Sequence, residues 1–114
     1  MEIIFFRSEG GKEPVAEFLD TLTPQQLQKV DFVFRVIEES VGMVPSSLFK
    51  KLSGADGIWE IRVSTRGSAL RFLSFIDQGR LVVAANGFDK KTRKTPQREI
   101  RLAESRKKDY EERV

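Results

Sequence analysis

Residues 58–88 read IWEIRVSTRGSALRFLSFIDQGRLVVAANGF, and this stretch decides the fold. From Ile58 onward, apolar and polar residues alternate with a period of two, which is the pattern of a β-strand. Turn signals interrupt the stretch at residues 66–67 and again at residues 77–80, where glycine accompanies charged residues. The sequence therefore predicts three consecutive strands that pair as an antiparallel meander.

One further strand and a short helix are predicted upstream. Residues 3–6 are an apolar run of strand type, and the glycine-rich turn signal at residues 8–11 closes it. We expect this strand to join the edge of the meander. Pro14 fits the first turn of a helix, and apolar residues recur at helical spacing as far as Leu22, near which the helix should end.

A second helix should begin after Thr23, which pairs with Gln26 as an N-cap and its capping-box partner. Its apolar residues form one stripe, made of Leu27, Val30, Phe34, Ile37 and Val41. The helix should stop near Gly42. We expect the two helices to form a hairpin whose apolar stripes pack against the sheet.

A third helix is predicted near the end of the sequence. Thr95 and Pro96 follow the loop at residues 89–94 and fit the N-cap and the first helical position. A thin apolar stripe follows, made of Ile100, Ala103 and Tyr110. The predicted order of elements is β-α-α-β-β-β-α.

The predicted fold class is α+β, with a small antiparallel sheet of about four strands, an N-terminal helical hairpin packed on it and a C-terminal helix. The 39% hydrophobic content, with nine Phe residues, supports a packed interior. At 114 residues the chain is long enough for one hydrophobic core and too short for two. We therefore expect residues 1–114 to form a single domain.

Positive charge gathers in the second half of the chain. The net charge is −4 over residues 1–49, +9 over residues 50–108 and −2 over residues 109–114. Such a surface attracts polyanions, because each Lys or Arg that meets a phosphate releases condensed counterions. The distribution predicts a nucleic-acid partner, with helix faces that merely solvate the protein as the alternative.

The sequence contains neither cysteine nor histidine. Without cysteine the chain has no thiol nucleophile and no disulfide, and without histidine it lacks the commonest metal ligand. We therefore expect no metal and no cofactor. The first residues lack the basic start and long apolar run of a signal peptide, and no stretch approaches the roughly 20 apolar residues of a membrane span. We expect a cytoplasmic protein with no membrane partner.

Polar and basic side chains converge on the predicted meander. Glu60 and Arg62 lie two residues apart on one strand and so share a face, while Trp59 is expected on the other face as a core residue. Arg71 interrupts an apolar stretch of the neighbouring strand, and a lysine-rich segment at residues 86–96 begins at the end of the last strand. Each feature also fits a structural role as a surface ion pair, a solvated edge residue or a polar connection.

Three segments carry a family resemblance: WEIR at residues 59–62, RFL at residues 71–73 and GFDKKTRKTP at residues 87–96. In this order they resemble the HigB-like, phage-associated branch of the RelE/ParE toxin superfamily, and the resemblance spans most of the chain. It implies a small antiparallel sheet with a helical hairpin against it. It also implies a type II toxin that cleaves mRNA on the translating ribosome without a metal. Such a toxin is held inactive by a cognate antitoxin, often a helix-turn-helix protein.

The resemblance implies a reaction in which a ribose 2′-hydroxyl attacks the adjacent phosphate. We predict Glu60 as the base and Arg62 and Arg71 as ligands of the scissile phosphate. Lys91, one of several crowded lysines, is the candidate for proton transfer. The residues expected to position RNA are Lys50, Lys51, Arg66, Asn86, Phe88, Lys90 and Lys94.

Two of these RNA-binding candidates have a second interpretation. Phe88 suits stacking on a base, but a phenylalanine at the end of a strand is also suited to burial. Many relatives have a histidine at the position of Asn86, and asparagine cannot relay a proton near neutral pH.

Two other functions stay open on the sequence alone. The same superfamily contains toxins that poison DNA gyrase through protein contacts rather than by cutting RNA. A non-catalytic RNA-binding module would use the same basic surface and would agree with the missing histidine.

Overall fold

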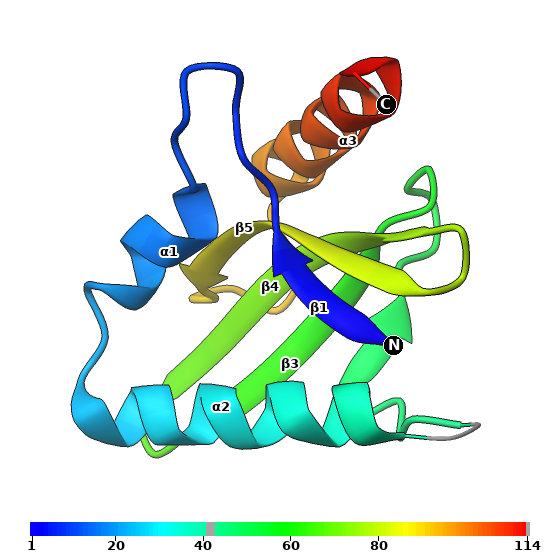
Figure 1. Ribbon diagram of the computed structural model, residues 1–114. Coiled ribbons are helices and arrows are strands. Elements are labelled where there is room, and N and C mark those ends of the chain that lie inside the picture. Colours follow the sequence, from blue (N-terminus) through cyan, green and yellow to red (C-terminus); the bar gives the residue numbers. More distant parts are fainter. Residues whose placement is uncertain (41–42, 114) are drawn as a thin grey trace.

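The structure, a computed structural model, describes residues 1–40 and 43–113. The strands in this part of the chain are β1 (Glu2–Phe5), β2 (Phe49–Lys51), β3 (Trp59–Thr65), β4 (Ser68–Asp77) and β5 (Leu81–Asp89). The helices are α1 (Pro14–Leu19), α2 (Pro24–Glu39) and α3 (Gln97–Arg113). The strands join in a sheet of order β1-β5-β4-β3-β2 (Figure 1). Among the described residues, no helix is long and apolar enough to cross a membrane.

Strands β3, β4 and β5 form the antiparallel meander that the sequence predicts. Arg62 on β3 lies opposite Arg71 on β4, and Arg71 in turn lies opposite Phe88 on β5. The turn between β3 and β4 is tight because Gly67 has a φ of +86°, a left-handed conformation that glycine adopts without steric cost. The predicted α+β fold class is confirmed.

The sheet differs in two respects from the one predicted. β1 joins the edge beside β5, as expected, but it runs parallel to β5, so the sheet is mixed. Lys50 and Lys51, expected just before the second strand, lie in a strand of their own, β2, which pairs with β3. Of the three residues in β2 only Phe49 is buried, and one buried residue gives no period-two pattern. The sheet formed by the described residues therefore has five strands.

Helix α2 begins as predicted. The Thr23 hydroxyl accepts a hydrogen bond from the N–H of Gln26, and the Gln26 side chain accepts one from the N–H of Thr23. This capping box satisfies two backbone donors that the first helical turn leaves free. α2 ends at Glu39, whereas the predicted stop near Gly42 and the predicted stripe residue Val41 lie outside the described residues.

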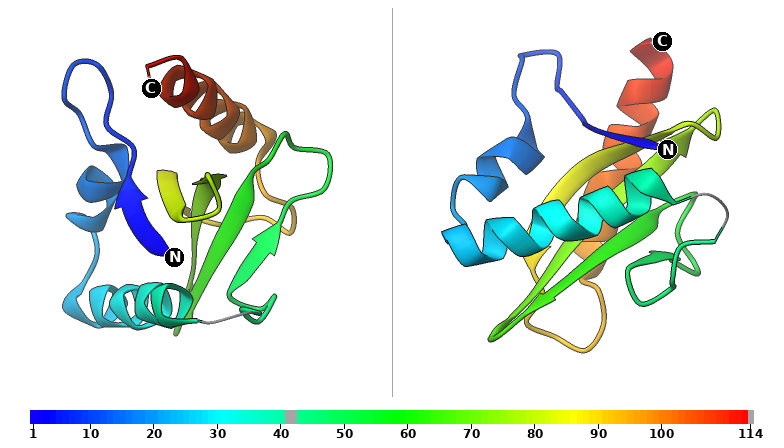
Figure 2. Two further views of the ribbon diagram at one scale, coloured as in Figure 1. Left: turned by 45° about the vertical axis from the view of Figure 1, so that its right-hand side comes forward. Right: turned by 60° about the horizontal axis from the view of Figure 1, so that its bottom comes forward.

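Both faces of the sheet are covered, one by α1 and α2 and the other by α3 (Figure 2). Val30 and Ile37 of α2 pack on the first face as predicted, and so does Val33, which lies between them. Leu27, expected in the same stripe, keeps 39% of its surface exposed. On the second face the predicted stripe of α3 is confirmed, and its members are Ile100, Ala103 and Tyr110.

A β-bulge decides which face the end of β5 presents to each helix. The pairing of β4 with β5 shifts between Leu73 and Ser74, which leaves Ala85 as an extra residue on β5. An extra residue reverses the alternation of side chains along a strand. Beyond the bulge, Asn86 faces α3 and Gly87 faces α1.

Gly87→Ala should destabilise the protein by about 1–3 kcal/mol, the usual cost of overpacking a dense core. A Cβ atom at this position would lie 2.6 Å from the Phe18 ring and 3.0 Å from the Phe72 ring. Gly10→Ala is the control, because its nearest neighbour would be the Ser8 hydroxyl at 3.9 Å. Urea unfolding compares the two variants with wild type, and equal midpoints for all three would contradict this close approach of α1 to β5.

Candidate functional site

A buried ionic cluster lies on the α3 face of the sheet. Glu60 of β3 has no solvent-exposed surface. Its Oε1 accepts a 2.8 Å hydrogen bond from Nε of Arg62 and lies 3.6 Å from Nε of Arg71. Its Oε2 accepts a 2.6 Å hydrogen bond from the hydroxyl of Thr95. The carboxylate thus joins β3, β4 and the segment that leads into α3, and we call these four residues the Glu60 cluster.

The environment of Glu60 controls its protonation. Burial by itself would raise the pKa of this carboxyl group, but the hydrogen bonds from Thr95 and Arg62 and the charges of Arg62 and Arg71 outweigh burial. The pKa of Glu60 therefore lies below its usual value. A general base works best with a pKa near the pH of the reaction and within reach of the proton. A lowered pKa makes Glu60 a weaker base than an ordinary carboxylate, and its contacts suit it to holding the arginines.

Arg62 and Arg71 lie side by side at paired positions of β3 and β4. The side chain of Arg62 is 30% exposed and that of Arg71 is 13% exposed. Burial lowers the pKa of Arg71 and the charge of Glu60 partly offsets this effect, yet arginine stays protonated in proteins. Two cations share one carboxylate, so the Glu60 cluster keeps a net positive charge that favours an anion.

An open cavity of about 420 Å³ lies beside the Glu60 cluster, and both Arg62 and Thr95 form part of its wall. Its lining comes from β2 and the residues after it, from β3, and from the segment between β5 and the start of α3. The charged side chains in the lining are all basic: Lys50, Lys51, Arg62, Lys90, Arg93 and Lys94. We call this cavity the basic groove.

The basic groove brings together five of the eleven predicted site residues. β2 pairs Lys50 directly with Glu60, which places this lysine on the same face of the sheet as the arginines. Arg71 does not line the groove, but its Nε lies 3.6 Å from Oε1 of Glu60, the same oxygen that accepts from Arg62 in the groove wall. The predicted residues in the lining are Lys50, Lys51, Arg62, Lys90 and Lys94.

Two predicted residues lie elsewhere. The Lys91 side chain is 75% exposed and its Nζ lies 2.9 Å from Oδ2 of Asp89, and Lys91 does not belong to the groove lining. The hydrogen bond from Lys91 is the main reason that the pKa of Asp89 is lowered. Arg66 is exposed at the tip of the hairpin between β3 and β4, also outside the lining. Neither residue is therefore part of the basic groove, and their predicted roles stay predictions.

The bulge places Asn86 and Phe88 on the α3 face, but both are needed for packing. Asn86 is buried, and its Nδ2 donates hydrogen bonds to the backbone carbonyl and to Oε1 of Glu99, at 3.2 and 3.0 Å. These bonds attach the first turn of α3 to β5 and leave Asn86 with 4% of its surface exposed, little with which to contact RNA. Phe88 lies opposite Arg71, half-buried against the core cluster beneath α3.

Thr95 is the main residue of the site that the sequence did not reveal. We predicted it as the N-cap of the last helix, because threonine before proline is typical of that position. The helix begins at Gln97, and the Thr95 hydroxyl donates to Glu60 instead. Arg93 and Gln97 also line the groove and had not been assigned a role. Only the density of basic residues around Arg93 was a signal for it.

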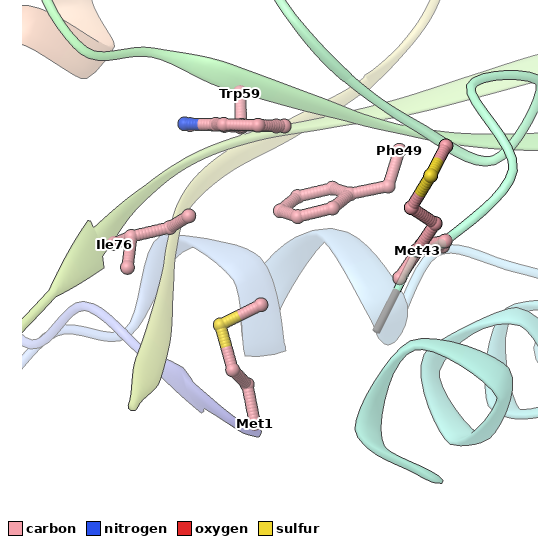
Figure 3. A pocket seen from close by; sticks show the side chains of 6 residues that line it. Met1, Met43, Phe49, Trp59 and Ile76 are labelled. Carbon is pink, nitrogen blue, oxygen red and sulfur yellow. The ribbon is translucent and has the colours of Figure 1, made fainter. Parts of the chain in front are cut away.

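A second cavity, of about 280 Å³, lies on the α2 face and is apolar (Figure 3). Trp59 stacks on Phe49 within it, with ring centroids 4.8 Å apart. Met1, Met43, Val44 and Ile76 complete its lining. Trp59 is therefore a packing residue, as expected from its alternation with Glu60.

Among the described residues, acidic side chains form no group of three or more that could hold a metal ion.

Fold and site together define a small α+β protein whose mixed sheet carries a buried glutamate, two arginines and a basic groove beside them. Residues 17–108, about four fifths of the chain, match the sequence pattern of the phage-derived Gp49-like protein family (DUF891). The chain belongs to this family, a RelE-like family associated with toxin-like proteins. A comparison with curated proteins finds no match. The predicted resemblance is thus confirmed at the level of a toxin-like family, and the assignment to the HigB-like branch stays a prediction.

Glu60→Gln should lower the free energy of unfolding at pH 7 by about 2 kcal/mol, because hydrogen bonds to a charged group contribute roughly that much. The folded state holds the pKa of Glu60 below its unfolded value. The ionised carboxylate therefore stabilises the fold above about pH 4.3, and this contribution is lost as the pH falls through the folded pKa. The stability difference between wild type and variant should shrink in acid.

The control for this variant is Asp31→Asn, which removes a carboxylate from an exposed ion pair with Arg35. An exposed pair contributes about 0–1 kcal/mol, so this variant should unfold close to wild type. Urea unfolding at neutral and acid pH gives both comparisons. If the difference for Glu60→Gln is the same at every pH, ionised Glu60 does not stabilise the fold.

Proposed function

We propose that this protein is a toxin of the HigB-like branch that cleaves mRNA on the translating ribosome in the cytoplasm. The observation that supports this most is the pairing of Arg62 with Arg71 on neighbouring strands, next to a groove whose charged lining residues are all basic. Single-stranded RNA needs such a groove for its phosphates, and a cleavage site needs cations fixed at one of them. The proposal includes a cognate antitoxin, a helix-turn-helix protein, that restrains the activity.

In the proposed reaction the arginines stabilise the negative charge that develops on the phosphate. The 2′-hydroxyl oxygen forms a bond to the adjacent phosphorus and loses its proton, while the bond from phosphorus to the 5′-oxygen breaks and that oxygen takes up a proton. Two guanidinium groups held by Glu60 can donate to the phosphate oxygens whose negative charge grows in the transition state. Because Glu60 and Asn86 are both buried, the protons pass through water in this proposal.

Lysines of the groove position the RNA backbone in this proposal. Lys50 and Lys51 come from β2, while Lys90 and Lys94 come from the segment after β5, so two separate parts of the chain supply the lining lysines. An RNA strand between them would present one phosphate to Arg62. Fixing a phosphate in this way makes the attack of the neighbouring 2′-hydroxyl effectively intramolecular and aligned.

A non-catalytic RNA-binding module is the second candidate. The observation that favours it is that the Glu60 carboxylate has no exposed surface and accepts hydrogen bonds from Arg62 and Thr95, so a 2′-hydroxyl in the groove does not contact it in this arrangement. Such a module would bind RNA through the same groove and leave it intact. Poisoning of DNA gyrase is the remaining alternative, and damaged DNA with intact mRNA would identify it.

Arg71→Ala should abolish growth arrest when the toxin is induced in a bacterial host, because removing one donor to a transition-state charge typically costs about 10²–10³ in rate. Arg101→Ala is the matched control: it removes the same charge from an exposed position on α3 outside the groove. Thermal melting shows whether Arg71→Ala remains folded. Mapping of mRNA 5′ ends after induction gives the activity. If the Arg71→Ala variant is folded and still arrests growth as strongly as wild type, the assignment of Arg71 to the phosphate is wrong.

Lys94→Ala should weaken RNA binding and reduce the dependence of affinity on salt. Each phosphate contact to single-stranded nucleic acid contributes about 0.7 to the slope of log K against log salt concentration. Lys91→Ala is the matched control, since Lys91 is a neighbouring lysine that does not line the groove. Titration of a labelled RNA at several salt concentrations measures both slopes. If the two variants lose the same slope, the groove is not where RNA binds.

A further inference from the structure

Thr95 belongs to residues 90–96, the stretch between β5 and α3 that we call the basic segment, and it contacts the carboxylate that holds the arginines. It lies in the stretch that joins β5 to α3, directly after Lys94, and its side chain forms part of the groove lining. Its hydroxyl donates to Oε2 of Glu60 at 2.6 Å. A hydrogen bond to a buried carboxylate is stronger than one between neutral groups. This contact therefore attaches the basic segment to Glu60 of β3.

This hydrogen bond also fixes the orientation of the carboxylate. With Oε2 held by Thr95, Oε1 is the oxygen that receives Nε of Arg62 at 2.8 Å and faces Nε of Arg71 at 3.6 Å. A quarter-turn of the carboxylate would move Oε1 away from both guanidinium groups. Arg71 is also held by a 3.0 Å hydrogen bond from its Nη1 to the carbonyl of Leu70, so the Thr95 hydroxyl acts mainly on Arg62 and on the charge shared with Arg71.

The rest of the segment is also held in place by hydrogen bonds. The N–H of Lys90 donates to the carbonyl of Ala69 at 2.8 Å, and the N–H of Ala69 donates to Oδ1 of Asp89 at 3.1 Å. These bonds anchor the start of the segment to β4. Thr95 anchors its far end to β3, so Lys90, Arg93 and Lys94 are carried between two fixed points.

We propose that Thr95 is a positioning residue: through Glu60 it sets the geometry of Arg62 and Arg71 and holds the basic segment at a fixed distance from them. The proposed ligand is one RNA phosphate, which the two arginines and Lys94 of the basic segment bind together. This inference rests on the proposed ribonuclease function.

The test compares Thr95→Val and Thr95→Ser with wild type in single-turnover cleavage of mRNA on programmed ribosomes. Valine keeps the shape of threonine without the hydroxyl, so the cleavage rate at saturating protein should fall at least about tenfold, because misplaced groups cost that much or more. The protein concentration needed for half-saturation should change less than about threefold, since the basic lining residues remain. Serine restores the hydroxyl and should recover the rate to within about twofold of wild type.

Thr92→Val is the matched control, because it removes a threonine hydroxyl from the same segment. That hydroxyl donates to the carbonyl of Lys94 and makes no contact with the Glu60 cluster. Its cleavage rate at saturation should therefore stay close to that of wild type. Thr95→Ala, which adds no bulk beside Glu60, repeats the comparison if melting shows that valine disturbs the fold.

The outcomes separate this inference from the proposed function. If wild type cleaves and Thr95→Val cleaves at the same saturating rate, Thr95 does not position the arginines. An equal loss of rate in Thr92→Val would likewise overturn the inference, since any disturbance of the segment would then suffice. If wild type does not cleave mRNA, the proposed ribonuclease function fails and this inference fails with it.

Discussion

The hydrogen-bonded carboxylate of Glu60 is the interaction on which the site depends. A buried charge is costly unless it is paired, and here the partners come from β3, β4 and the segment before α3. Those three parts of the chain must therefore keep one arrangement. Because the carboxylate fixes them, lysines that are far apart in the sequence can line one groove. The site is thus built around a residue that is itself inaccessible to a substrate.

The segment that carries the family resemblance owes part of its pattern to packing. Gly87 leaves room for Phe18 of α1, and Thr95 binds Glu60. The bulge at Ala85 turns Asn86 toward α3, where it attaches the start of that helix. A protein could keep this segment for its fold alone. The pattern therefore identifies the family more firmly than it identifies an activity.

The sequence predicted those features that repeat regularly or depend on neighbours in the chain. The meander, the Thr23 capping box and the shared face of Glu60 and Arg62 are of this kind. The short strand β2 and the bulge in β5 were missed, because they arise from pairing between distant segments. The burial of Asn86 and the bond from Thr95 to Glu60 depend in turn on where α3 docks. Sequence reasoning therefore found the charges but not the partners that hold them.

The central claim is that the arginine pair and the basic groove hold an mRNA phosphate while the neighbouring 2′-hydroxyl attacks it. The most direct test incubates the purified protein with programmed ribosomes and determines the chemistry of the new RNA ends. The account predicts cleaved mRNA with a 2′,3′-cyclic phosphate on one fragment and a 5′-hydroxyl on the other. Ribosome-bound mRNA that stays intact while the protein is bound to it would contradict the account.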